Sequence, residues 1–228
     1  MLPFDKTATI YKSSHKTVPW SHCPDKHLRS GDNVMLRNDK TQGYLVMDLN
    51  TRQLGVEESY QLTTTKKNPG PVTRSMFVLR RAEKVDIFGS DDIIRYGSKI
   101  KIEANPYVFK KKLWITSMPL GPQVYSSGSR HQEASVNAGE QYNGTWIIDA
   151  IDPNSRFERQ GEPVKVGEPV LIRHCQTGHY LASDDVAIKS DFGSECEVMC
   201  HSFAKANKTQ NLALEKKGAL TSDIGTRF

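Results

Sequence analysis

The chain has 228 residues, 37% of them hydrophobic and 25% charged, and its 31 Lys and Arg outnumber its 26 Asp and Glu to give a net charge of +5. This composition excludes collagen-like, coiled-coil and fully disordered chains. No apolar run approaches the roughly 18–20 residues that a bilayer span needs, so we expect no membrane association. The opening residues Met1 to Lys6 lack an apolar signal core, and we therefore expect the four cysteines to be free thiols of a cytoplasmic protein.

The first 27 residues precede the first recognisable pattern and are predicted to form an N-terminal arm. Aromatic residues are scattered through it without a clean period, among them Phe4, Tyr11 and Trp20. Such a segment is either an extended arm that docks on another surface or a disordered tail. We take these three aromatic side chains as candidate partner contacts.

One pattern then occurs three times, in the segments Leu28 to Leu36, Ile94 to Ile102 and Val164 to Ile172. Counted from a shared glycine, position −3 is aliphatic, −2 is basic, +1 is small or acidic, and +3 and +5 are aliphatic. Aliphatic residues two apart face the same side of an extended chain, which predicts a half-buried strand in each copy. The glycine predicts a tight turn or bulge with positive φ.

Two further patterns follow each copy. Aromatic–aliphatic pairs begin at Tyr44, Trp114 and Tyr180, and apolar triplets begin at Phe77, Trp146 and Leu212. Each unit therefore opens and closes with a strand and leaves room for a hairpin, about four strands per unit. Three units that close around a common axis bury their apolar faces together. The sequence predicts an all-β fold, a pseudo-threefold β-trefoil of three four-stranded units over residues 28–214.

Two segments are longer than the pattern requires, residues 46–75 in the first unit and residues 118–145 in the second. Both are rich in turn-forming residues, and we expect two long loop insertions. The basic pairs and runs near them, Lys66, Lys67, Lys110, Lys111 and Lys112, are candidate contacts to an acidic protein surface. Residues 215–228 are predicted to form a polar C-terminal tail.

Sequence motifs for metal binding, catalysis or nucleic-acid binding are weak or absent. A zinc site would need ligands from a group of six residues whose spacing fits only loosely: His174, Cys175, His179, Cys196, Cys200 and His201. The alternative is core cysteines with surface imidazoles. No nucleophile elbow, phosphate loop or nucleic-acid motif is present. We expect no catalytic residue, no metal, no cofactor and no nucleic-acid partner. The protein is therefore not expected to be an enzyme.

The stretch from Gly167 to Leu181 resembles the MIR-type β-trefoil, found in calcium-release channels and protein mannosyltransferases. An ordered set of residues also resembles the cilia- and flagella-associated protein 161 family of microtubule inner proteins. This set comprises Arg95-Tyr96-Gly97, Asp152-Pro153, Arg156, Glu158, Gly161, Pro163-Val164, His174-Cys175, Phe192-Gly193, Glu195, Glu197-Val198 and His201.

The resemblance implies a non-catalytic structural protein in the lumen of the A-tubule of ciliary and flagellar doublet microtubules. Its implied partners are alpha/beta-tubulin and other microtubule inner proteins, its implied place is the axoneme of the cytoskeleton, and its implied role is to stabilise the axoneme and support motility. The alternative is a MIR-like module that binds a glycan, a phosphoinositide or a protein.

Overall fold

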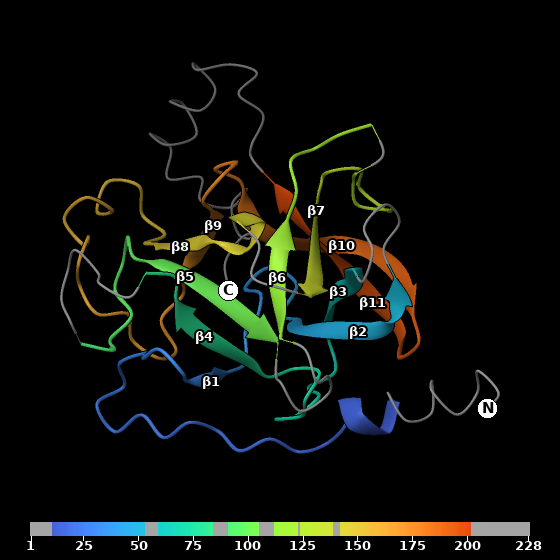
Figure 1. Cartoon of the computed structure of the whole chain (residues 1–228), viewed down its shortest axis with the longest axis horizontal. Coiled ribbons are helices and arrows are strands. Elements are labelled where there is room, and N and C mark those ends of the chain that lie inside the picture. The colour runs from blue at the N-terminus through green and yellow to red at the C-terminus, as the bar shows by residue number, and fades with distance from the viewer. Residues whose placement is uncertain are drawn as a thin grey trace.

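The computed structural model describes residues 11–52, 59–83, 91–104, 112–122, 124–138 and 142–201. Eleven strands account for most of the ordered structure (Figure 1). Their bounds are β1 Asn33–Val34, β2 Tyr44–Arg52, β3 Ser59–Thr65, β4 Phe77–Arg81, β5 Lys99–Ala104, β6 Leu113–Ser117, β7 Gln132–Ala138, β8 Trp146–Asp149, β9 Leu171–His174, β10 Tyr180–Ser190 and β11 Gly193–His201. The helical residues in the described part are limited to residues 11–14 and the 3₁₀ turn Tyr142–Gly144. The all-β prediction is confirmed.

The strands form one continuous antiparallel network that closes on itself. Within it, β5, β6, β7, β3, β11, β10, β9 and β8 pair in sequence, and β8 pairs with β5 again to complete an eight-strand ring. On the other side β1 pairs with β4, and β4 pairs with β5. Closure removes free edges, which would otherwise invite pairing with other chains.

Three hairpins, β2–β3, β6–β7 and β10–β11, lie at one end of this network, and each pairs with the other two. Strand β3 pairs with β7, β7 with β11, and β11 with β3. The register is cyclic: Gln61 lies opposite Ser135, Glu133 opposite Met199, and Glu197 opposite Thr63.

The three copies of the repeated pattern meet at the other end. The amide of Leu28 donates to the carbonyl of Val164 at 2.9 Å, that of Val164 to Ile94 at 2.9 Å, and that of Ile94 to Leu28 at 2.8 Å. The glycines Gly31, Gly97 and Gly167 have φ of +104°, +81° and +83°. The prediction of a positive-φ turn is thus confirmed in all three copies, because only glycine adopts this backbone without steric cost.

The core fills the space between these two ends. The aliphatic positions of the second and third copies are buried: Ile94, Ile100, Ile102, Val164 and Ile172 are at most 2% exposed, and Val170 is 7% exposed. In the first copy Leu28, Val34 and Leu36 are partly buried against the same cluster. The inward assignment of the aliphatic residues is confirmed, and their burial provides the main driving force for folding.

The aromatic–aliphatic pairs lie at the start of β2, β6 and β10 as predicted, with Trp114 the second residue of β6. The apolar triplets at Phe77 and Trp146 open β4 and β8. The triplet at Leu212 and the tail 215–228 lie outside the described residues. Four strands are therefore described in each of the first two units and three in the third.

The prediction of two long loop insertions is wrong. Residues 46–75 contain most of β2 and all of β3, and residues 118–145 contain β7. Both β3 and β7 have polar sequences, Ser-Tyr-Gln-Leu-Thr-Thr-Thr and Gln-Glu-Ala-Ser-Val-Asn-Ala, yet six of seven residues in each are buried. Hydrogen bonds between neighbouring strands satisfy part of this buried polarity, as where Asn137 donates to Thr116 at 2.7 Å.

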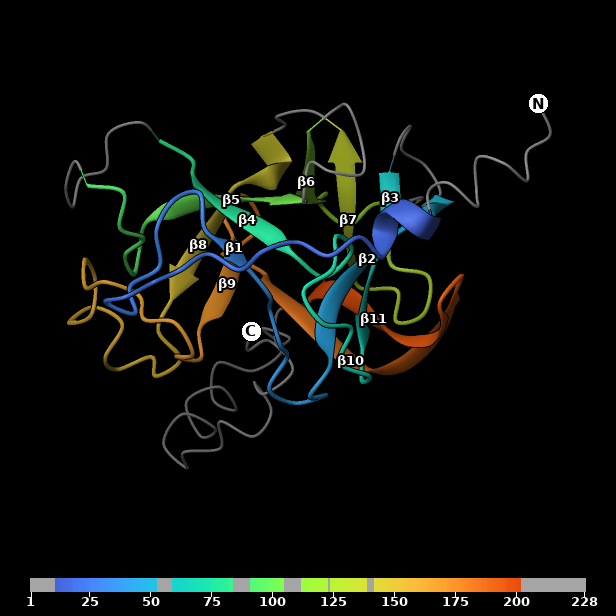
Figure 2. The same ribbon diagram turned by 90° about the horizontal axis from the view of Figure 1, so that it is seen from below.

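The described part of the N-terminal segment, residues 11–27, docks on the strands. Figures 1 and 2 show it as an extended blue segment that runs along the molecule past β2 and β1. The amide of Val18 donates to Pro71 at 2.8 Å, and the amide of Thr73 donates to Lys16 at 2.9 Å. The docked alternative holds for these residues, and the surface they dock on belongs to the chain itself.

Candidate interaction surface

The described residues hold no group of three or more His, Cys, Asp or Glu that would suit a metal ion. Cys196 and Cys200 are buried, as expected of small core residues. His174 is also buried and not on the surface: its ring packs against Trp146, and its nitrogens contact the Thr177 hydroxyl and the Asn143 carbonyl. Burial lowers its pKa, so the neutral imidazole is the form that the site favours.

Residues of the family resemblance around Glu195 build a buried ionic network. Glu195 accepts hydrogen bonds from Arg74 at 2.8 Å and from Thr63 at 2.7 Å. The guanidinium of Arg74 lies 3.5 Å from the centroid of the Phe192 ring. Arg74 and Glu195 side chains are 5% and 3% exposed. The network joins the segment before β4 to the turn of the β10–β11 hairpin.

The N-terminal segment covers this network. The ring of Tyr11 stacks on Phe192 with centroids 5.2 Å apart and an interplanar angle of 14°, and His15 packs 5.4 Å from the same ring. Tyr11, a candidate partner contact, thus contacts the chain's own hairpin while 45% of its surface remains exposed.

The other candidate contacts lie apart in the sequence and on different elements. Trp20 is 58% exposed. Lys66 and Lys67 follow β3 and are exposed, and Lys66 forms an ion pair of 3.3 Å with Asp185. Lys112 is exposed just before β6. Phe4, Lys110 and Lys111 lie outside the described residues.

Several exposed apolar side chains escaped the sequence analysis. Phe157 is 86% exposed, Tyr142 73% and Leu120 60%. Phe157 lies in the turn-rich loop of residues 151–161, where Arg156 donates to the Ala150 carbonyl at 2.8 Å. The sequence feature that could have identified Phe157 is a single aromatic residue within a polar run. Exposed aromatic residues are common anchors at protein interfaces.

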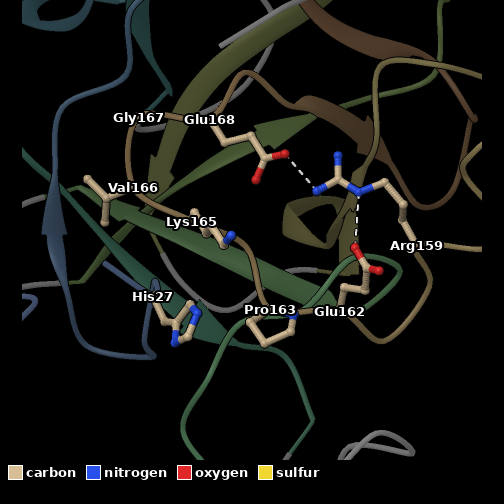
Figure 3. Close-up of a pocket in the computed structure, with 8 residues that line it drawn as sticks. All are labelled: His27, Arg159, Glu162, Pro163, Lys165, Val166, Gly167 and Glu168. Atoms are coloured by element: carbon tan, nitrogen blue, oxygen red, sulfur yellow. Dashed lines mark hydrogen bonds and ion pairs between the residues drawn. The ribbon is translucent and has the colours of Figure 1, made fainter. Parts of the chain in front are cut away.

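A pocket of about 640 Å³ opens where the first and third copies of the repeat meet (Figure 3). Most of its lining residues belong to the third copy or the segment before it, and the set is His27, Arg159, Glu162, Pro163, Lys165, Val166, Gly167 and Glu168. Arg159 bonds to Glu162 at 3.1 Å and to Glu168 at 2.6 Å, so these three charges are satisfied within the wall.

Tyr96 lies behind this wall. The Arg159 guanidinium is 4.2 Å from the centroid of its ring. Burial, with the neighbouring carboxylate of Glu168, raises the pKa of Tyr96 to about 12. The phenol therefore stays neutral at physiological pH, and its ring supports Arg159 as a fixed part of the pocket.

Residues 116–213 match the sequence model of the cilia- and flagella-associated protein 161-like domain. A cilia- and flagella-associated protein 161 of Danio rerio is 27% identical over 92% of this chain and 74% of its own length. The protein of the same name from Bos taurus is 26% identical over 68% of this chain, which spans about half of that relative.

Solved structures support the fold alone. An SDF2-like protein of Arabidopsis thaliana matches 77% of this chain and 88% of its own, with a TM-score of 0.58 and 17% identity. A chain of the S. cerevisiae protein O-mannosyltransferase Pmt1-Pmt2 complex matches 79% of this chain and 24% of its own, with a TM-score of 0.58 and 20% identity.

These matches agree with the family resemblance that units two and three predict. Among the described residues, neither helical segment has the length or apolarity of a membrane span. By its sequence the chain is similar to proteins of the cilia- and flagella-associated protein 161 family over most of its length.

Proposed function

We propose that this protein is a non-catalytic structural component of the axoneme, a microtubule inner protein that binds tubulin in the lumen of the A-tubule and stabilises doublet microtubules. The family match carries this proposal, because it associates the chain with cilia and flagella. The arrangement of the described residues suits such a role: a closed β network with a docked arm presents fixed surface residues to several neighbours at once.

The fold proposed for this role is a MIR-like β-trefoil. Three hairpins that pair cyclically, and three repeat copies joined by a cycle of backbone hydrogen bonds, are what a pseudo-threefold axis would produce. The closing strands of the first two units pair with the opening strand of the next, β4 with β5 and β8 with β9. By the same symmetry, a twelfth strand at Leu212 to Leu214, outside the described residues, would pair with β1. A trefoil core would act as a rigid block while exposed loops and termini contact the lattice.

Many weak contacts suffice for a protein enclosed in a polymer. Contacts made to a repeating lattice act together, so the effective affinity exceeds that of any single contact. The exposed aromatic residues Trp20 and Phe157 offer apolar anchors. Exposed lysines such as Lys67 and Lys112 would meet acidic patches on tubulin, and such contacts weaken with salt.

Localisation tests the proposal directly. A tagged protein is expressed in ciliated cells, and axonemes are prepared by detergent extraction and imaged by cryo-electron tomography. We expect the protein to remain with the doublets after detergent and to contribute density inside the A-tubule. Absence from axonemes, release by detergent alone, or density on the outer surface would refute the luminal role.

A MIR-like ligand-binding module is the second candidate, and the pocket at His27, Lys165 and Arg159 is the observation that favours it. Its ligand would be a glycan or a phosphoinositide. Titration calorimetry of the purified chain with oligosaccharides and with inositol phosphate headgroups separates the two candidates. Micromolar binding of either probe would favour the module.

A further inference from the structure

The basic residue at position −2 of each repeat copy has a partner at position −6 in two copies. Arg29 pairs with Asp25 in the first copy, and Arg95 pairs with Asp91 at 2.7 Å in the second. The two ion pairs are related by the repeat, since each joins a basic residue to the carboxylate four residues before it. Internal repetition thus predicts a third pair in the third copy.

The third copy lacks this pair. Its basic residue is Lys165, and Gly161 occupies the position of the acid. Gly161 has φ of +88° and its carbonyl accepts a hydrogen bond from Arg95 at 3.0 Å. A left-handed backbone favours glycine over aspartate. The turn therefore disfavours an acid at this position, and the exposed Lys165 has no ion-pair partner among the described residues.

Lys165 lines the 640 Å³ pocket between the first and third copies. Figure 3 shows its ammonium group between Arg159 and His27, with Pro163 and Val166 on the same segment. The acids of the pocket, Glu162 and Glu168, are both bonded to Arg159. The pocket thus offers a cation, Lys165, that has no ion-pair partner among the described residues, with the apolar side chains of Pro163 and Val166 on the same segment.

We propose that this pocket receives the carboxylate of an acidic side chain from a partner protein, which completes the third ion pair at Lys165. A glutamate fits best, because its methylene groups would pack on Val166 and Pro163 while its carboxylate reaches the ammonium group. The inference deepens the proposed function by naming the chemistry of one partner contact. The peptide-binding test is made in solution. It can therefore fail while the localisation test of the proposed function succeeds, and it can succeed while the localisation test fails.

The test is fluorescence anisotropy of a labelled peptide of alternating glutamate and valine, titrated with the purified full chain. We expect Lys165→Gln to weaken binding about three- to tenfold, the loss of one charge-assisted hydrogen bond. Lys165→Arg retains binding. Lys189→Gln removes the same charge from an exposed lysine of β10 and leaves binding unchanged. A peptide with glutamine in place of glutamate binds at least tenfold more weakly.

Each alternative result overturns the inference. No binding of the acidic peptide at millimolar concentration removes the site. Equal peptide affinities of the wild type and Lys165→Gln would place the contact elsewhere. An equal loss of affinity in Lys189→Gln and Lys165→Gln would reveal a non-specific charge effect. Preference for a lysine–valine peptide would assign the pocket to Glu162 and Glu168. Because the Lys165 side chain is exposed, its variants are expected to melt like the wild type, which a thermal scan verifies.

Discussion

Arg74 and Glu195 form an ion pair of 2.8 Å in the interior, with side chains 5% and 3% exposed, between the segment before β4 and the third hairpin. Removing one partner would leave a buried charge uncompensated. We expect Arg74→Met to lower the free energy of unfolding by about 3 kcal/mol or more. Urea denaturation measures the change.

The matched control for this prediction is the exposed pair Lys66–Asp185, in which both side chains are 67% exposed. Lys66→Met is expected to change stability by less than about 0.5 kcal/mol. Equal effects of the two substitutions would show that burial does not decide the strength of these ion pairs.

Glu133 gives stability a specific pH dependence. It lies in β7, is 4% exposed, and burial raises its pKa to about 7, against a smaller opposite effect of a hydrogen bond with Ser135. Between its unfolded pKa near 4.5 and pH 7 the native state holds the proton that the unfolded state releases, so stability falls as pH rises through this window. The loss reaches up to about 3 kcal/mol. It is measured by denaturation from pH 5 to pH 8.

Glu133→Gln isolates this contribution, because the amide is an uncharged analogue of the protonated acid. The difference in stability between the variant and the wild type should grow with pH up to about 7 and then level off. A difference that stays constant over this range would contradict a raised pKa. Buried histidines such as His174, whose pKa is lowered, act in the opposite sense and are common to both proteins.

Two repeat glycines are expected to respond differently to alanine. Gly167 has φ of +83° and open space at its Cβ position, so Gly167→Ala should cost about 1 kcal/mol from the backbone alone. At Gly97, with φ of +81°, a Cβ would lie 3.0 Å from the Gln160 side chain. We expect Gly97→Ala to cost about 1 kcal/mol more. Equal midpoints in urea for the two variants would show that Gln160 moves aside freely.

Phe192 holds the start of the described arm through its contact with Tyr11. We expect Phe192→Ala to free this end, so that trypsin cleaves after Lys12 several times faster while the folded core survives. Mass spectrometry of the early products gives the rate. Phe157→Ala removes an equally large ring that is 86% exposed, and it should leave the cleavage rate unchanged.

The repeated pattern was enough to predict the strands that carry the core, because residues such as Ile100 and Ile172 alternate in the sequence as they do in space. A hairpin was predicted in each unit, but the positions of β3 and β7 were missed, because turn-forming residues in 46–75 and 118–145 suggested long loops. Their polar residues, such as Thr63 and Ser135, are buried where the hairpins pair. Phe157 and the open pocket at Lys165 were not predicted either, because exposure and the juxtaposition of distant copies depend on tertiary structure.

The cycle of hydrogen bonds among Leu28, Ile94 and Val164 has a consequence for biosynthesis. The first copy bonds directly to the third, so the nascent chain cannot complete the cycle until residue 164 has left the ribosome. Contacts so distant in sequence form slowly. Until then the earlier strands keep exposed edges and apolar faces, so the growing polypeptide is prone to aggregation until residue 164 emerges.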